Sequence, residues 1–257
     1  MIDYYLHPER QIPRLRPLKA IHHMRKLIAD KESTEQFFHM MEALNGASLM
    51  RRFDDFLGSA NGKKRFQDRR YLPPILDDHS WIETLPENSL GKAYMRFMKQ
   101  EKLSAQGLVE ESDKFRQNAK SYKDDFDWYS KRLRDTHDLF HILTGYGRDP
   151  LGEACLLGFT HPQHKARGFL IVGFMAAFEV KQRSPKGTKV WSCFREGRQN
   201  GKLADVIAEH DLIALMHRPL EEARAHLNIA QPKAYYEMLE FLAAKGVDPN
   251  TLNSIAA

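Results

Sequence analysis

Apolar residues recur every three or four positions along most of the chain, which is the spacing of one face of an α-helix. Alternating patterns typical of β-strands are scarce. The spacing predicts helices over residues 14–31, 166–183, 203–208, 220–227 and 233–244. We therefore expect an all-α protein that folds as a single domain over residues 1–257, with residues 1–70 as a helical N-terminal subregion and residues 71–230 as its core.

One helix boundary is marked by a polar residue. Ser89 precedes Leu90, Tyr94 and Met98, which are spaced as one helical face, so Ser89 is a predicted N-cap.

A central helix is predicted to begin near Lys123 and to end before Gly145, a residue typical of helix C-termini. Asp149 and Pro150 then provide a cap and a first-turn proline for the next helix. The apolar stripe of the central helix comprises Tyr129, Leu133, Phe140 and Leu143.

Residues 14–31 combine an apolar stripe with dense basic charge. Leu18, Ile21, Met24, Leu27 and Ile28 form the predicted stripe. We favour a helix that packs through this stripe and exposes its basic face, and contact with anionic lipid headgroups is the alternative.

The formal net charge of +5 does not select a partner, because acidic residues are interleaved with basic ones. The basic residues form no nucleic-acid-binding motif, so no nucleic-acid partner is expected. Two cysteines do not make a disulfide framework, and residues 1–10 contain no apolar signal segment, so the expected location is intracellular. The longest apolar run, residues 169–178, is shorter than the ~20 residues of a membrane span.

The segment from Asp135 to His141 carries the candidate chemistry. Each helical residue advances by about 100°, so Asp138 and His141 lie about 100° and 40° from His137. Two imidazoles and one carboxylate therefore share one arc of the helix, beside its buried stripe. This is a chelating arrangement, although packed histidines that bond to nearby carboxylates would give the same spacing.

Glu153 is the expected fourth ligand. It falls in the first turns of the helix after a short loop, and helices joined so closely are usually neighbours. His137, Asp138, His141 and Glu153 would suit one divalent ion, either Zn or one of Fe, Co and Mn.

A metalloprotease is the competing interpretation of two histidines at this spacing. The HExxH motif places a glutamate general base between its two ligands. Asp138 is one methylene shorter and would place the base poorly, so we rank this interpretation low.

The sequence resembles the ubiquinone (coenzyme Q) biosynthesis protein conventionally numbered four. The resemblance is carried by the segment from His137 to His141, by Leu151-Gly152-Glu153 and by residues 85–94, which resemble an LPxxSLGxxY segment. Tyr71-Leu72-Pro73-Pro74 fits the lead-in, and the stretch through Leu220, Arg224 and Leu227 is similar more loosely. The resemblance covers roughly residues 65 to 230.

The resemblance implies an all-helical protein that acts in ubiquinone biosynthesis, with His137, Asp138, His141 and Glu153 as metal ligands and catalytic residues. The implied reaction replaces the carboxylate at carbon 1 of a polyprenylated hydroxybenzoate by hydroxyl. The alternative is a non-catalytic, lipid-binding organiser of the quinone-biosynthesis enzymes. The resemblance also implies a homodimer with other ubiquinone-biosynthesis enzymes as partners. This homodimer would be peripheral on the cytoplasmic face of a bacterial inner membrane, or alternatively on the matrix side of the mitochondrial inner membrane.

A prenylated substrate requires an apolar pocket. Residues 168–178 are apolar on nearly every face, and Gly173 and Ala177 permit a neighbouring helix to approach closely. Such a helix is usually core, and a prenyl-lipid pocket beside the metal is the sharper hypothesis. Arg148 is a candidate for contact with an acidic head group.

Overall fold

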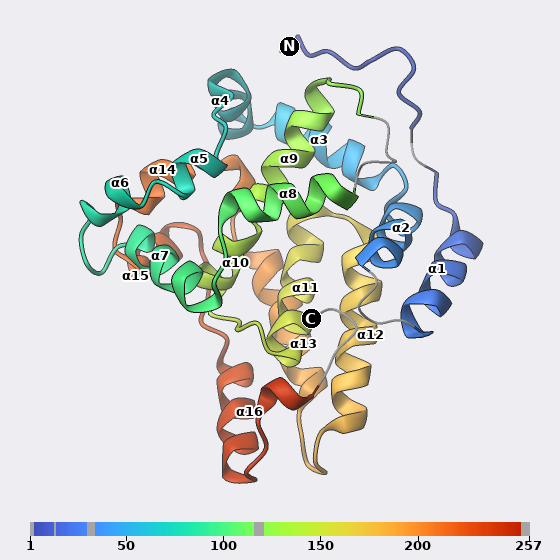
Figure 1. Cartoon of the computed structure of the whole chain (residues 1–257), viewed down its shortest axis with the longest axis vertical. Helices are drawn as coiled ribbons and strands as arrows, with labels where there is room; N and C mark the ends of the chain where they lie inside the picture. The colour runs from blue at the N-terminus through green and yellow to red at the C-terminus, as the bar shows by residue number, and fades with distance from the viewer. Residues whose placement is uncertain (1–2, 13, 30–33, 116–120, 253–257) are drawn as a thin grey trace. The chain divides into compact units, whose positions relative to one another are not determined.

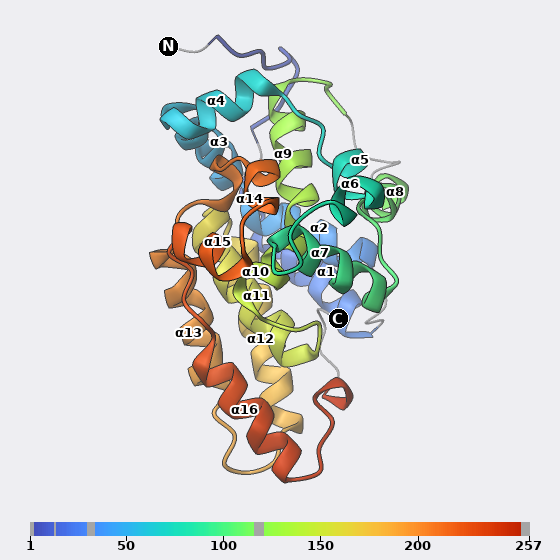
Figure 2. The same cartoon turned by 90° about the vertical axis from the view of Figure 1, so that its left-hand side faces the viewer.

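The computed structural model describes residues 3–12, 14–29, 34–115 and 121–252 (Figures 1 and 2). Over these residues the chain is helical and contains no β-strand, which confirms the all-α prediction. The helices are α1 (Pro17–Ala29), α2 (Thr34–Asn45), α3 (Ser48–Gly58), α4 (Ala60–Asp68), α5 (Pro73–Leu76), α6 (His79–Glu83), α7 (Leu90–Glu101), α8 (Ala105–Phe115), α9 (Asp125–Asp135), α10 (His137–Thr144), α11 (Pro150–His164), α12 (Arg167–Arg183), α13 (Val190–Leu203), η2 (Ile207–Glu209), α14 (Leu212–Met216), α15 (Leu220–His226), α16 (Lys233–Ala244) and η3 (Pro249–Thr251).

The chain forms two compact units that alternate along the sequence. Unit 1 comprises residues 1–12, 50–143 and 206–227, and unit 2 comprises residues 13–49, 144–205 and 228–257. The prediction of a single domain with an N-terminal subregion and a core stays a prediction.

Unit 1 has an aromatic core between α3 and α9. The rings of Phe53 and Phe56 lie 5.2 and 5.0 Å from the ring of Tyr129, and all three side chains are buried. Burial of large aromatic side chains supplies most of the apolar area that stabilises such a core. In the same unit, Ser89 caps α7 as predicted, because its hydroxyl accepts a hydrogen bond from the Lys92 amide at 3.1 Å.

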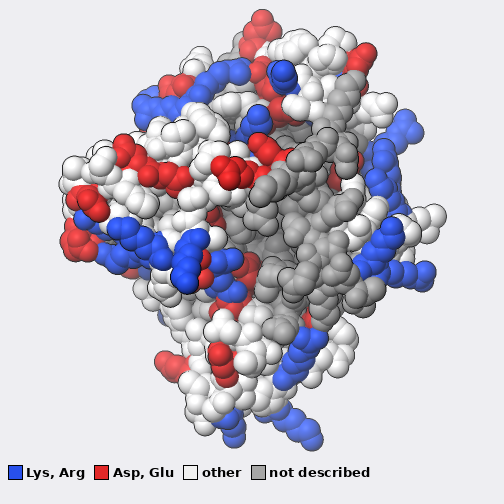
Figure 3. All heavy atoms as spheres, in the orientation of Figure 1, with Lys and Arg blue, Asp and Glu red and all other residues white. Residues whose placement is uncertain are grey.

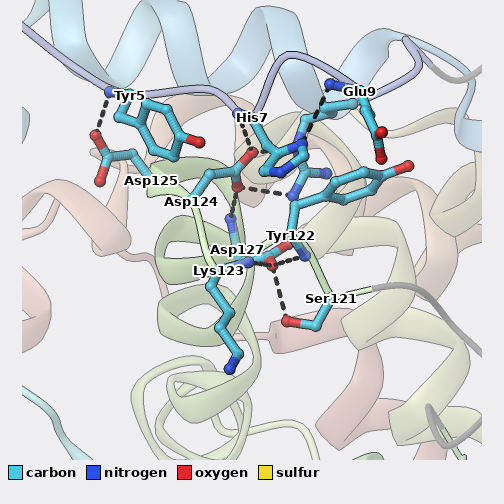
Figure 4. Close-up of polar contacts among 10 residues, drawn as sticks. Tyr5, His7, Glu9, Ser121, Tyr122, Lys123, Asp124, Asp125 and Asp127 are labelled. Carbon is cyan, nitrogen blue, oxygen red and sulfur yellow. Dashed lines mark hydrogen bonds and ion pairs between the residues drawn. The ribbon is translucent and has the colours of Figure 1, made fainter.

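The segment before α1 is attached to the start of α9 by acidic side chains (Figure 4). Asp124, the N-cap of α9, accepts hydrogen bonds from the His7 amide and from the Arg10 guanidinium. Asp125 accepts another from the Tyr5 amide at 2.5 Å. Burial opposes ionisation of Asp124, but the hydrogen bonds outweigh it and lower the pKa of its carboxyl group.

The predicted central helix is two helices. Thr136 ends α9 with φ −96° and ψ −3°, and α10 begins at the next residue, His137. The Thr136 hydroxyl donates to the Leu133 carbonyl at 2.9 Å. Threonine hydroxyls that bond to the preceding turn in this way compete with the regular helical pattern, which accounts for a break that the apolar periodicity does not reveal.

Helix α11 is the centre of unit 2 and packs against α12 and α13 (Figure 1). Glycines at the crossings permit this close packing. A Cβ atom added to Gly201 of α13 would lie 2.2 Å from the Phe159 carbonyl oxygen of α11. One added to Gly173 of α12 would lie 2.9 Å from the Leu157 Cβ, which confirms the predicted close approach at Gly173.

The predicted helix over residues 203–208 is wrong. Leu203 is the last residue of α13, and Ala204 is extended with φ −68° and ψ 146°. The sequence pattern also missed α13, because Gly197 and Gly201 look like helix breakers. Both serve helix packing, since a Cβ atom at either position would collide with a carbonyl oxygen of α11.

Helix α1 is oriented differently from the prediction. Ala20 and Met24 face a cluster formed by α2, α11 and α12, whereas Leu18 is 83% exposed and Ile21 is 41% exposed. The side chains of Leu27 and Ile28 lie outside the described residues. The small Ala20 permits close contact with α2, so the larger apolar side chains are left on the outer face.

Helix α12 confirms the predicted apolar helix in extent, but it is not buried all round. Ile171, Phe174 and Phe178 are exposed along one side of it. Within the described ranges, no helix combines the length and the apolar composition that a membrane span requires.

Both cysteines lie in unit 2, and both are buried free thiols. Burial raises the pKa of the Cys155 thiol well above its usual value and that of Cys193 to about 12. Both groups are therefore protonated in the folded protein at neutral pH.

We predict that Gly201→Ala lowers the free energy of unfolding by about 1–3 kcal/mol, because the added methyl group forces α11 and α13 apart. Gly58→Ala is the matched control, since a Cβ atom there meets no atom within 4 Å. Urea denaturation followed by circular dichroism measures both. Equal stability of the two variants would contradict the close helix crossing.

Candidate metal centre

The two predicted histidine ligands lie one turn apart on α10. The ring centroids of His137 and His141 are 5.3 Å apart, and the ring planes are nearly perpendicular. His141 is buried, and His137 is more exposed. The local sequence alone produces this pairing, because residues separated by four positions lie on the same helical face.

Glu153 belongs to the same group of potential ligands. One donor atom from each of His137, His141 and Glu153 lies within 4.8 Å of the other two. Imidazole nitrogen and carboxylate oxygen are both common ligands of divalent metal ions, so this group could hold one.

Asp138, the fourth predicted ligand, is not part of this group. It lies in the first turn of α10 and is partly buried. Its role as a ligand stays a prediction.

Asp149 fixes the start of the helix that carries Glu153. Its carboxylate accepts hydrogen bonds from the amides of Leu151 and Gly152, both at 3.1 Å, and Pro150 occupies the first helical position. The predicted cap and first-turn proline are thus confirmed. Glu153 lies in the first turn of α11, where the helix dipole favours a negative charge.

Tyr235 of α16 holds the cap in place. Its hydroxyl donates to the carboxylate of Asp149 and accepts a hydrogen bond from the Gly147 amide at 3.1 Å. Burial, reinforced by the negative charge of Asp149, raises the pKa of Tyr235, so the hydroxyl remains a donor. The loop before α11 and the start of α11 are therefore linked through a single buried tyrosine.

Gly152 is needed next to Glu153 because the backbone folds tightly there. A Cβ atom at Gly152 would lie 2.2 Å from the Gly147 carbonyl oxygen. The Leu-Gly-Glu motif thus places the glutamate directly after a position where no side chain fits.

Two further contacts support α10, and sequence reasoning missed both. Phe97 of α7 stacks on His141, with ring centroids 5.6 Å apart and an angle of 22° between the planes. Arg224 of α15 donates to the carbonyls of Ile142 and Leu143 at 2.8 and 2.9 Å, and so satisfies the last turn of α10. Arg224 lies in the stretch that resembles the family more loosely, and Phe97 lies three residues beyond the segment 85–94, but their contacts join positions far apart in sequence.

The remaining candidates from the sequence are less well placed. Arg148 is exposed, so its contact with an acidic head group stays a prediction. The prenyl-lipid pocket beside the metal also stays a prediction.

The residues present fit a divalent ion. Two imidazoles and one carboxylate suit Zn, Fe, Mn or Co and not a soft metal. On α7, the buried hydroxyl of Tyr94 has no hydrogen-bond partner.

The described part of the chain is thus all-helical and contains two histidines and one carboxylate that could hold a metal ion. The family model described as "Coenzyme Q (ubiquinone) biosynthesis protein Coq4" matches residues 26–233. The chain belongs to this family, which is involved in ubiquinone biosynthesis, and the family predicted from the sequence is confirmed.

Curated relatives carry the same family name. The chain is 22% identical over 191 residues to "Ubiquinone biosynthesis protein coq4, mitochondrial" of Penicillium rubens, which covers 74% of this chain and 63% of that protein. It is 26% identical over 185 residues to the protein of the same name from Talaromyces stipitatus, covering 70% and 59%. The chain thus spans about three fifths of the length of these relatives.

A solved structure shares the fold. The crystal structure of a candidate ubiquinone biosynthesis protein from Nostoc punctiforme PCC 73102 superposes with a TM-score of 0.62. The match covers 82% of this chain and 97% of that chain at 20% identity.

We predict that Tyr235→Phe lowers the free energy of unfolding by about 1.5–3 kcal/mol, because the charged carboxylate of Asp149 loses the hydrogen bond that the Tyr235 hydroxyl donates. Tyr236→Phe is the matched control: Tyr236 is 39% exposed, and its hydroxyl lies 3.4 Å from its acceptor, the Gly145 carbonyl. Denaturation in urea compares the two variants. If Tyr235→Phe were as stable as Tyr236→Phe, Tyr235 would not hold the cap.

Proposed function

We propose that this protein catalyses the metal-dependent oxidative decarboxylation of a polyprenylated hydroxybenzoate, replacing the carboxylate at carbon 1 by hydroxyl. The observation that carries the proposal is the grouping of His137, His141 and Glu153 within 4.8 Å in a member of the ubiquinone-biosynthesis family. A ligand set of two histidines and one carboxylate leaves coordination positions open for a substrate.

The reaction needs oxygen and a two-electron donor. The bond between ring carbon 1 and the carboxylate breaks, and a bond from that carbon to oxygen forms. One carboxylic acid, O₂, two electrons and two protons give one phenol, CO₂ and water. The external donor supplies the electrons that reduce the second oxygen atom.

The residues of the site have separate tasks in this proposal. His137, His141 and Glu153 hold the ion, and Asp138 is the predicted fourth ligand. The bound ion supplies a Lewis acid for the carboxylate or phenolate oxygen and, if it is iron, redox chemistry with oxygen. Phe97 limits the orientations of His141, and Arg224 fixes the end of α10.

We predict that the purified protein, given Fe²⁺ or Zn²⁺, a prenylated hydroxybenzoate, O₂ and a reductant, yields the decarboxylated and hydroxylated ring with at least one of the two metals. His141→Ala should lose more than about 100-fold of this activity and most of the bound metal. Mass spectrometry of the lipid and elemental analysis of the protein measure both. His79→Ala, at an exposed position of α6, is the control that should behave as wild type.

The organiser is the second candidate function, because the same ion could hold a head group without turnover. Two results together would support the organiser function. Wild type and His141→Ala would both be inactive in this assay, but only wild type would restore quinone synthesis in cells. Co-purification with other ubiquinone-biosynthesis enzymes would follow from that function. Absence of both metal and lipid from the wild-type protein would contradict both proposals.

Peripheral binding to a membrane is part of the proposal, because a polyprenylated substrate resides in a bilayer. Helix α1 supports it. Leu15, Leu18 and Ile21 are exposed, and residues 14–29 contain five basic residues and no acidic one. Figure 3 shows Lys and Arg side chains along the edge where α1 lies in Figure 1.

An exposed apolar stripe within basic charge fits an anionic lipid surface. The cytoplasmic face of a bacterial inner membrane is the proposed site, and the matrix side of the mitochondrial inner membrane is the alternative that the names of the curated relatives favour. A homodimer remains the proposed oligomeric state.

We predict that Leu18→Glu weakens binding to vesicles of phosphatidylcholine and phosphatidylglycerol by about tenfold or more, because it removes apolar burial and adds repulsion. Leu203→Glu is the control, because Leu203 is also largely exposed, at 63%, but lies outside α1. Vesicle sedimentation at low and high salt measures the affinity. Equal binding of the two variants would remove α1 from the contact surface.

A further inference from the structure

Tyr94 carries a buried polar group that forms no hydrogen bond. The side chain is 2% exposed, and its hydroxyl forms no hydrogen bond. Folding removes this hydroxyl from water without replacing the lost hydrogen bond, which costs free energy. A phenylalanine would fill the same space without that cost, so packing alone does not account for a tyrosine.

Tyr94 lies on α7, which contacts α10, the helix that carries two of the candidate ligands. Tyr94 and Phe97 are three residues apart on α7, and therefore lie on one side of that helix. Phe97 stacks on His141, which fixes this side of α7 against α10. Asp138 and His141 are likewise three residues apart on α10.

Three carboxylates act on Tyr94. Burial raises the pKa of its hydroxyl most, and the negative charge of Asp138 raises it further, ahead of Asp77 and Asp135. Asp77 accepts hydrogen bonds from the amides of Ala105 and Gln106, both at 2.8 Å, and so caps α8. Asp135 is paired with the Arg134 guanidinium at 2.8 Å. Asp138 is the carboxylate of the three that is also a predicted metal ligand.

We propose that Tyr94 is a positioning residue of the metal site. When an ion is bound, its hydroxyl donates a hydrogen bond to the carboxylate of Asp138 and holds that carboxylate toward the ion. This inference rests on the proposed metal site. Carboxylates that bind metals are commonly held by such outer hydrogen bonds, and loss of one typically weakens metal affinity by about 10- to 100-fold.

The proposal separates two properties that a structural tyrosine would change together. In the metal-free protein, Tyr94→Phe removes an unsatisfied polar atom, so the melting temperature should stay the same or rise. In the presence of Zn²⁺, the same variant should bind the ion about 10- to 100-fold more weakly than wild type. A merely structural role predicts lower stability without metal and an unchanged affinity.

The experiment measures Zn²⁺ affinity by competition with a chromogenic chelator, and stability by thermal denaturation without metal. Tyr129→Phe is the matched control, because Tyr129 is equally buried in unit 1 but packs against Phe53 and Phe56. This control should bind Zn²⁺ as wild type does. An unchanged Zn²⁺ affinity of Tyr94→Phe would overturn the proposal.

A double-mutant cycle tests the stated partner. In an Asp138→Ala background, Tyr94→Phe should have no further effect on Zn²⁺ affinity, because its acceptor is already absent. Asp138→Leu, which is closer to Asp in size and also lacks an acceptor, serves in the same way if the alanine variant fails to fold. Additive effects of the two substitutions would refute the link to Asp138.

The outcomes separate this inference from the proposed function. If wild type binds Zn²⁺ and Tyr94→Phe binds it equally well, the role of Tyr94 is wrong while the metal site stands. If wild type does not bind Zn²⁺, Fe²⁺ or Co²⁺, the metal site and this inference are both wrong.

Discussion

The hydrogen bonds of the Asp149 carboxylate determine where α11 begins, and much of unit 2 depends on that position. A buried carboxylate is stable only if its oxygens are paired, and here two backbone amides and one tyrosine hydroxyl pair them. Because α12, α13 and α16 all pack against α11, the hydrogen bonds of Asp149 also affect where these helices lie in unit 2. Glu153 is one turn further along α11, so its place follows from the cap.

The predictable parts of the protein are those that depend on neighbours in sequence. The caps at Ser89 and Asp149 could be predicted, because a cap needs only a short polar side chain before a helical pattern. The pairing of His137 with His141 is also local, since helix geometry alone brings them together.

The parts that could not be predicted depend on contacts between distant segments. Phe97 and Arg224 contact α10 from other helices, and the sequence around them does not predict that α10 is their partner. Gly197 and Gly201 misled the helix prediction, because their use in packing is visible only when α11 lies beside α13. The buried face of α1 could not be predicted for the same reason. Ala20 faces the cluster that α2 helps to form, and that contact depends on the tertiary structure.

The burial of both thiols in unit 2 has a consequence for how opening of this protein can be observed. Alkylating reagents react with the thiolate, and the folded protein holds Cys155 and Cys193 protonated and away from solvent. Labelling therefore proceeds only through molecules in which unit 2 has opened. Because unit 1 contains no cysteine, the labelling rate reports the opening of unit 2 alone. The two native cysteines suffice for this measurement, so no probe has to be introduced.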